Sequence, residues 1–112
     1  MKRIEVVVSQ DKVADVCTVL DNAGHRGVTL THLEEQGGHA GWVNHIRGIS
    51  HIVNLLSKVR VEVVVQDRDL ESTLKTIRDA VWTGEPGCGK IFVHDVADAI
   101  RIRTSESGMA AI

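Results

Sequence analysis

Alternation of apolar and polar residues predicts four β-strands along this chain. In the clearest of them every second residue from Val59 to Val65 is a valine, so the four valines share one face of the strand. The N-terminal strand shows the same alternation at Ile4, Val6 and Val8. The four strands are predicted at residues 2–9, 28–33, 58–66 and 91–96.

Two further segments place apolar residues at the spacing of an α-helix. The first helix is expected to begin at Asp11, which can cap it, and to run to Asn22, with Gly24 as its C′ residue. The second is expected to follow a cap at Asp67 or Asp69. The two apolar stripes are Val13, Val16, Cys17 and Leu20 in the first helix and Leu70, Leu74, Ile77 and Val81 in the second.

The order strand–helix–strand occurs twice, which predicts a single α+β domain over residues 1–112. Two such units can form one antiparallel sheet with both helices on one face, the ferredoxin-like βαββαβ arrangement. Trp82, at the end of the second helix, is expected in the core. Because apolar residues occur on both faces of the sheet and the helices cover only one, we expect a closed homo-oligomer to cover the other.

Residues 34–54, between the second and third strands, show no regular period and are expected to form a long loop. Long loops in compact domains are usually functional or disordered. His39, His45 and His51 lie six residues apart, a spacing that is not diagnostic of metal ligands, so a metal site and a polar surface for a partner both stay open. Trp42 either anchors an interface or packs onto the base of its own loop.

Composition and charge exclude several classes of protein. A net charge of −2 argues against a nucleic-acid binder and against a polybasic membrane surface. No apolar run approaches the roughly 18 residues of a spanning helix, and residues 1–10 do not resemble a signal peptide, so we expect a cytoplasmic protein. Cys17 and Cys88 fit a reducing compartment without a disulfide. No nucleophile is marked with a base, so no enzymatic activity is predicted.

A glycine-rich turn at residues 83–90 is the first candidate for binding chemistry. In Gly87-Cys88-Gly89-Lys90 the glycines let backbone N–H groups approach an anion, and the lysine adds a positive charge that suits phosphate. An ordinary helix-to-strand turn can have the same composition, so these residues alone leave both interpretations open.

Two arginines near the C-terminus are the second candidate. In an extended segment over residues 99–103, Arg101 and Arg103 project to the same side, where an anion between them would relieve their repulsion. The alternative is a pair of solvated surface arginines. The end of this C-terminal arm, residues 98–112, is expected to be mobile.

The whole chain resembles the PII family of signal-transduction proteins, with a diverged T-loop, the loop through which PII proteins contact their targets. The strongest match lies in Gly87–Val96 and Ala99–Thr104, which resemble the C-terminal signature of the family. Further matches are Met1–Ile4, Gly24, Gly27, Thr29, Thr31, Thr83-Gly84, Arg47-Gly48, Lys58 and Glu62.

This resemblance implies a cytoplasmic homotrimer that senses ADP, AMP or ATP in clefts between subunits and needs no obligatory cofactor. The glycine turn and Lys90 would hold the phosphates, and the two arginines would reach them from the neighbouring subunit. Thr29, Glu62 and Val64 would contact ribose and adenine. The predicted nucleotide-binding residues are Gly27, Val28, Thr29, Glu62, Val64, Gly87, Cys88, Gly89, Lys90, Arg101 and Arg103.

Residues 34–54 match the T-loop in position but not in content. The chain has no tyrosine, which excludes tyrosine-linked nucleotidylation. His39 replaces a family glutamine that chelates magnesium with 2-oxoglutarate, and imidazole prefers softer metals. Gly38 replaces an arginine, which favours ADP or AMP over ATP, and Cys88 replaces an aspartate. Lys58, which pairs with 2-oxoglutarate in the family, is kept.

These departures favour bicarbonate over 2-oxoglutarate as a second small ligand. The candidate residues for it are Gly37, His39, Gly41 and Lys58. The expected partner is a target protein that the T-loop contacts, a membrane transporter linked to inorganic carbon; no nucleic acid is expected. The alternatives are a standard nitrogen-regulatory PII role and a metal-binding trimer linked to heavy-metal efflux, which only the histidines suggest.

Overall fold

The computed structural model describes residues 1–36, 42–46, 49–53 and 55–112. Its helices are α1 (Val13–Asn22) and α2 (Leu70–Val81). Its strands are β1 (Lys2–Ser9), β2 (Thr29–Gln36), β3 (Trp42–Ile46), β4 (Ile49–Val53), β5 (Leu55–Val65) and β6 (Lys90–Asp95). Short 3₁₀ turns lie at Gln10–Lys12, Asp67–Asp69 and Gly108–Ala111.

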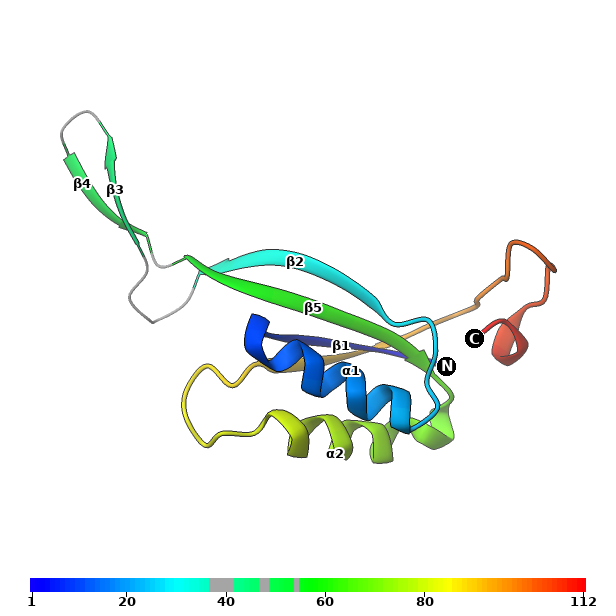
Figure 1. The fold of residues 1–112 in the computed structure, drawn as a ribbon. Coiled ribbons are helices and arrows are strands. Elements are labelled where there is room, and N and C mark those ends of the chain that lie inside the picture. Colours follow the sequence, from blue (N-terminus) through cyan, green and yellow to red (C-terminus); the bar gives the residue numbers. More distant parts are fainter. Residues whose placement is uncertain (37–41, 47–48, 54) are drawn as a thin grey trace.

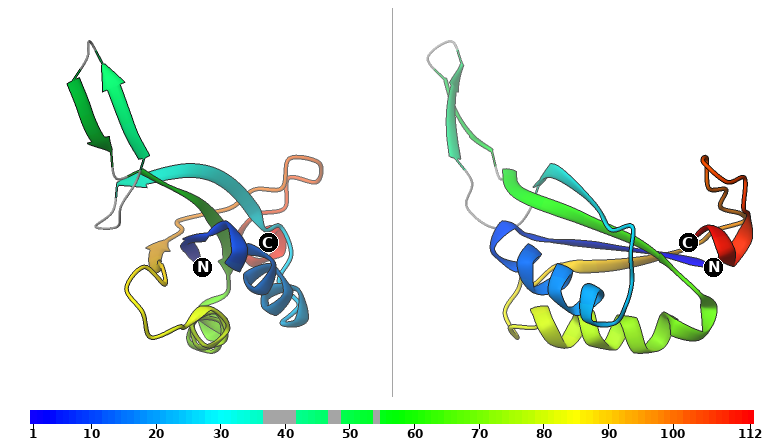
Figure 2. Two further views of the ribbon diagram at one scale, coloured as in Figure 1. Left: turned by 60° about the vertical axis from the view of Figure 1, so that its left-hand side comes forward. Right: turned by 45° about the vertical axis from the view of Figure 1, so that its right-hand side comes forward.

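Four of the strands form one antiparallel sheet in the order β2-β5-β1-β6. Both helices lie on the same face of this sheet, α1 and α2 side by side (Figures 1 and 2). This order and the one-sided helix layer are those of the predicted ferredoxin-like α+β fold, which is therefore confirmed. The opposite face of the sheet carries no helix or strand of the described chain.

The core lies between the sheet and the helices. Alternate residues of β1 and β5 point into it, as the valine pattern predicted, and each is at most 2% exposed. Each helix adds one apolar stripe to this core. The strands therefore contribute every second side chain to the core, and the helices contribute side chains at the 3.6-residue repeat of an α-helix. The buried apolar residues are Ile4, Val6, Val8, Val16, Leu20, Val59, Val61, Val63, Val65, Ile77 and Val81.

The prediction that Trp82 belongs to the core is wrong, because its side chain is 65% exposed. The α2 helix ends at Val81, and Trp82 has an extended backbone (φ −64°, ψ 128°), which turns it away from the buried stripe. A Cβ added to Gly84 would lie 3.3 Å from the indole ring, so the ring covers the start of the following turn instead.

The predicted helix caps are also only partly correct. A 3₁₀ turn precedes each helix, and neither Asp11, Asp67 nor Asp69 caps one through its side chain. Asp11 instead hydrogen-bonds the hydroxyl of Ser9. Gly24 follows α1 at φ +82° as predicted, a conformation that residues with a Cβ rarely adopt.

The predicted irregular loop over 34–54 is wrong in its described part. β2 continues to Gln36, β5 begins at Leu55, and between them β3 pairs with β4 in a separate antiparallel hairpin. This hairpin projects from the end of the sheet where β2 ends and β5 begins (Figures 1 and 2). Apolar alternation marks strands that bury one face, so it does not detect a projecting two-stranded ribbon.

Candidate functional site

The glycine-rich turn, residues 83–90, joins α2 to β6 and rests against the edge of β1. A Cβ on Gly89 would lie 2.5 Å from the carbonyl oxygen of Val7, and the backbone there has φ +121°. Only glycine fits both the contact and the dihedral angle. Gly87 is also left-handed, at φ +89°. The turn therefore presents its backbone closely packed on the sheet, with Lys90 opposite Val7 as the first residue of β6.

The side chain of Cys88 forms hydrogen bonds with other residues of this turn. Its Sγ lies 2.8 Å from the hydroxyl of Thr83, and its thiol donates a hydrogen bond of 2.9 Å to the carbonyl oxygen of Glu85. The hydrogen bond with the Thr83 side chain is the main cause of a pKa below the usual value for this thiol. Cys17 and Cys88 are both free thiols in the structure. The turn is thus held by contacts of its own residues, apart from any ligand.

The residues predicted to contact ribose and adenine lie on β2 and β5, on the far side of β1 from β6. Thr29 on β2 is directly opposite Glu62 on β5, so a hydroxyl and a carboxylate face the same open side. Val64 follows on that side and lines a cavity of about 330 Å³ together with Gly27 and Arg101. Three predicted nucleotide-binding residues, distant in the sequence, therefore meet around one cavity. Val28 instead packs against the core.

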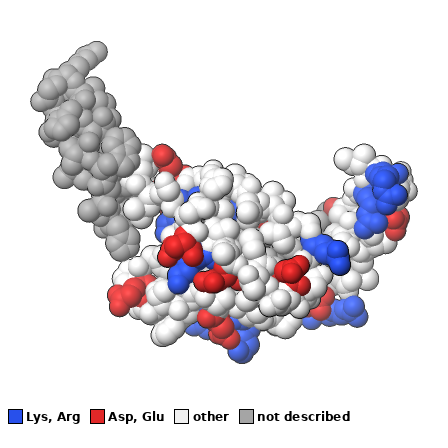
Figure 3. All heavy atoms as spheres, viewed as in Figure 1, with Lys and Arg blue, Asp and Glu red and all other residues white. Residues whose placement is uncertain are grey.

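The glycine-rich turn and the two arginines do not meet within one protomer. The turn, in yellow, lies at one end of the sheet and the C-terminal arm, in orange and red, at the other (Figure 1). Between them runs β6, whose six residues span about 16 Å. Basic atoms gather over the C-terminal arm, which contains Arg101 and Arg103, well away from the turn (Figure 3). One phosphate cannot contact both groups in the same chain.

The C-terminal arm is not the extended segment that the sequence predicted over residues 99–103. Ile100 forms a β-bridge with Ser107, and the chain reverses at residues 102–104 between them. Arg101 and Arg103 therefore do not share one face of a strand. A carboxylate that the sequence analysis missed holds the turn: Oε1 of Glu106 lies 3.2 Å from Nη1 of Arg101. No spacing rule marks such a pair, because the reversal that creates it is not periodic.

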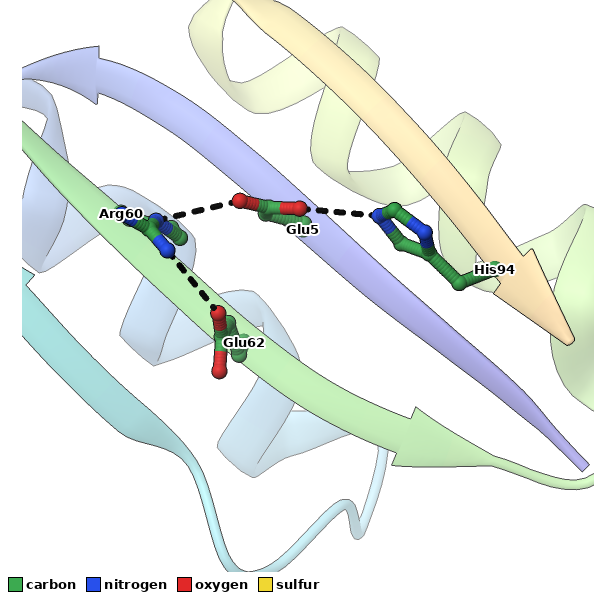
Figure 4. A network of polar contacts seen from close by, with 4 residues as sticks. All are labelled: Glu5, Arg60, Glu62 and His94. Carbon is green, nitrogen blue, oxygen red and sulfur yellow. Dashed lines mark hydrogen bonds and ion pairs between the residues drawn. The ribbon is translucent and has the colours of Figure 1, made fainter. Parts of the chain in front are cut away.

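The open face of the sheet carries a network of polar contacts among Glu5, Arg60, Glu62 and His94 (Figure 4). Glu5 lies at its centre: one carboxylate oxygen is 3.0 Å from Nε of Arg60 and the other is 2.9 Å from Nε2 of His94. Arg60 also reaches Glu62, at 3.7 Å. The pattern of residues predicted apolar side chains on this face and did not reveal the network. Its contact with Glu62 orients one of the predicted nucleotide-binding side chains.

Near the base of the hairpin, Lys58 is only 9% exposed. It lines a cavity of about 540 Å³ with Gln10, His32 and Ser57. The other predicted residues of a second ligand site (positions 37, 39 and 41) lie outside the described residues. In the parts of the chain that are described, no group of three histidine, cysteine or acidic residues could hold a metal ion. No helix of those parts is long and apolar enough to cross a bilayer.

Comparison with known proteins agrees with this architecture over its full length. Residues 1–106 match the family described as nitrogen regulatory protein P-II. The nitrogen regulatory protein P-II of Rhizobium meliloti (strain 1021) is 41% identical over 112 residues, covering all of both chains. Nitrogen regulatory protein P-II 1 of Methanothermobacter thermautotrophicus is 40% identical, covering all of this chain and 97% of the relative.

Solved structures give the same assignment. The crystal structure of Arabidopsis thaliana PII bound to citrate superposes with a TM-score of 0.80 at 33% identity, covering 99% of this chain and 91% of that one. The residues that match these relatives in sequence include those that form the four-stranded sheet and its helix layer. This chain is therefore a member of the P-II family of regulatory proteins.

Proposed function

We propose that this protein senses adenine nucleotides as a homotrimer, binding each nucleotide in a cleft between two protomers. One observation carries the proposal: the glycine turn with Lys90 and the cavity that contains Val64 and Arg101 lie at opposite ends of the sheet. Two incomplete halves of one site become complete when a second copy brings its cavity to the turn of the first. The sheet face that no helix covers supports the same assembly.

Each half has the chemistry that its part of the nucleotide requires. Backbone N–H groups of the turn and the Lys90 ammonium suit the phosphates, since they offer close donors and a positive charge. Arg101 adds a guanidinium, which can bind phosphate oxygens bidentately. On the other half, Val64 offers an apolar surface to the base, while Thr29 and Glu62 offer polar groups to the ribose and the base edge.

The regulatory output follows from the position of the β3–β4 hairpin, which projects beyond the sheet (Figure 2). A nucleotide at the cleft can alter how this hairpin is held and hence which target it contacts. We propose that the target is a membrane transporter linked to inorganic carbon. Bicarbonate, a small anion, would then bind in the cavity beside Lys58.

A second candidate function is nitrogen regulation through 2-oxoglutarate. The curated relatives favour it, because proteins about 40% identical over the full chain are named nitrogen regulatory proteins. The citrate bound to the Arabidopsis protein is also a carboxylate ligand. Either anion would bind in the same cavity beside Lys58, so the two candidate functions differ in the ligand and not in its binding site.

Calorimetric titration with ADP, AMP and ATP tests the main proposal. The wild-type chain should bind at least one of them, and Lys90→Ala or Arg101→Ala should weaken binding roughly 10- to 100-fold by removing a charge-assisted contact. Arg68→Ala, an exposed change in the 3₁₀ turn that precedes α2, is the matched control and should leave affinity unchanged. Absence of heat with every nucleotide would refute the proposal.

Mixing two defective variants tests whether the cleft is shared. Lys90→Ala and Arg101→Ala protomers, unfolded and refolded together, should regain tight sites in about one quarter of the clefts, because some clefts then combine two intact halves. If both halves came from the same protomer, mixing would restore nothing. Sedimentation of the same samples reports the trimer.

The second ligand is tested by titrating bicarbonate, and separately 2-oxoglutarate with Mg²⁺, into the protein saturated with ADP. Bicarbonate heat that Lys58→Met abolishes supports the carbon-linked proposal. Heat only with 2-oxoglutarate assigns the protein to nitrogen regulation and overturns the bicarbonate assignment.

A further inference from the structure

Arg101 is engaged by the protein's own chain. Its Nη1 lies 3.2 Å from Oε1 of Glu106, and its backbone N–H donates a 2.8 Å hydrogen bond to the carbonyl oxygen of the same residue. The backbone N–H of Ser105 in turn donates to the carbonyl oxygen of Arg101, also at 2.8 Å. The two side chains are thus brought together by a closed turn, and not by chance proximity on the surface.

The same arm carries the end of the chain to the cavity of the predicted adenine half-site. The N–H of Gly108 lies 3.0 Å from the carbonyl oxygen of Ala99 and 3.1 Å from a carboxylate oxygen of Asp98, which fixes the start of the last 3₁₀ turn. Beyond it, Ala111 and Ile112 line the cavity that Arg101 also lines. The arm, its arginine and the cavity therefore form one continuous unit.

We propose that Glu106 is an internal competitor for the nucleotide phosphate: its carboxylate holds Arg101 within the same protomer and must be displaced when a nucleotide binds. This inference rests on the proposed nucleotide site and describes its regulation. A carboxylate, like a phosphate, offers the guanidinium a negative charge and oxygen acceptors. The competitor is tethered five residues from the arginine, so it is always present at high local concentration.

The strength of the pair suits a competitor that tunes affinity without blocking it. The Arg101 and Glu106 side chains are 41% and 44% exposed, so solvent screens their attraction. A phosphate shared with backbone donors and Lys90 forms more charge-assisted contacts than one exposed carboxylate. The nucleotide therefore displaces Glu106 from Arg101, but at a higher concentration than it would need without Glu106.

The test compares ADP binding to the full-length wild type and to Glu106→Gln by calorimetry. The glutamine keeps the size of the side chain and removes its charge, so affinity should rise about two- to fivefold, the factor that an exposed ion pair supports. Glu106→Ala should change affinity in the same direction, which guards against an effect of the glutamine itself. Glu71→Gln, an exposed glutamate on α2, is the control for net charge.

The decisive arm is the same change in an Arg101→Gln background. If Glu106 acts by holding Arg101, the change from glutamate to glutamine has no effect there. An equal gain in affinity in both backgrounds would mean that the charge of Glu106 acts on nucleotide binding without Arg101, and it would overturn the inference. Unchanged affinity in Glu106→Gln would also overturn it. These outcomes leave the nucleotide site intact. A wild-type chain that binds no adenine nucleotide overturns both proposals.

Discussion

Glu5 and Arg60 form a diagonal ion pair across the two central strands of the sheet, with Oε1 3.0 Å from Nε. The residue directly opposite Glu5 is not Arg60 but Glu62, another carboxylate. Arg60 reaches both, since it also lies 3.7 Å from Glu62. Like charges opposite each other destabilise an antiparallel pair, so this arginine compensates a repulsion that the strand register imposes (Figure 4).

The first prediction concerns this compensation. Arg60→Met should lower the free energy of unfolding by about 1–3 kcal/mol, because it leaves two facing carboxylates without their shared cation. Adding Glu5→Gln should recover part of that loss, since only one carboxylate then remains. Urea unfolding of both single variants and the double variant measures the coupling. Strictly additive effects would show that the arginine does not bridge the two.

The second prediction is a pH dependence that arises at the edge of the sheet. The ammonium of Lys2 hydrogen-bonds the carboxylate of Asp95, which lowers the pKa of Asp95 and raises the pKa of Lys2. A lowered Asp pKa stabilises the fold above the unfolded value of about 3.9, and this contribution is lost as pH falls through the folded pKa. A raised Lys pKa stabilises the fold below the unfolded pKa of about 10.4, and this contribution is lost as pH rises through the folded pKa.

Asp95→Asn should therefore reduce stability at pH 7, and the difference from the wild type should close in acid. Thermal unfolding of both proteins between about pH 3 and pH 8 gives the comparison. A deficit of equal size at every pH would contradict an ionic origin. Lys2→Gln should show the same deficit at neutral pH.

The third prediction compares two glycines in left-handed conformations. Gly24→Ala meets no atom within 4 Å, so only the backbone angle opposes it, at a cost of about 1–2 kcal/mol. Gly89→Ala adds a contact of 2.5 Å with the Val7 carbonyl oxygen and should cost about 2–4 kcal/mol. Chemical denaturation measures both. Equal costs would mean that the turn can move away from β1.

Gly89→Ala should also weaken phosphate binding in the proposed site, whereas Gly24→Ala should not. The turn must shift to relieve the contact, and its backbone donors shift with it. Calorimetry with ADP on the two variants separates this local effect from a loss of folded protein.

The fourth prediction concerns the reactivity of Cys88. Because the hydrogen bond with Thr83 lowers the pKa of the thiol, Thr83→Val should raise it and slow alkylation by iodoacetamide at neutral pH. The pH at half-maximal rate should move upward in the variant. A Cys17→Ser background removes the second thiol and confines the signal to Cys88. An unchanged pH profile would show that the hydroxyl does not stabilise the thiolate.

Much of the fold was predictable, because burial imposes periodicity. Alternate valines in β5 and the stripes of α1 and α2 had to face the core, so the βαββαβ order and the α+β class followed from the pattern. Features without a buried face were not predictable in this way. The β3–β4 hairpin and the reversal of the chain after Arg101 are examples, and Trp82 was misplaced because the helix ended one residue earlier.

By itself the sequence determined the strands, the helices, the glycine turn with its lysine, and the family resemblance, because each depends on residues that are close together in the chain. Only the tertiary structure decided which distant residues meet: Val64 with Arg101 around a cavity, Glu5 with Arg60 and His94, and Arg101 with its own Glu106. It also placed the turn and the arginines at opposite ends of the sheet. Strand register and chain reversal bring these residues together, and neither can be recognised from a periodic pattern in the sequence.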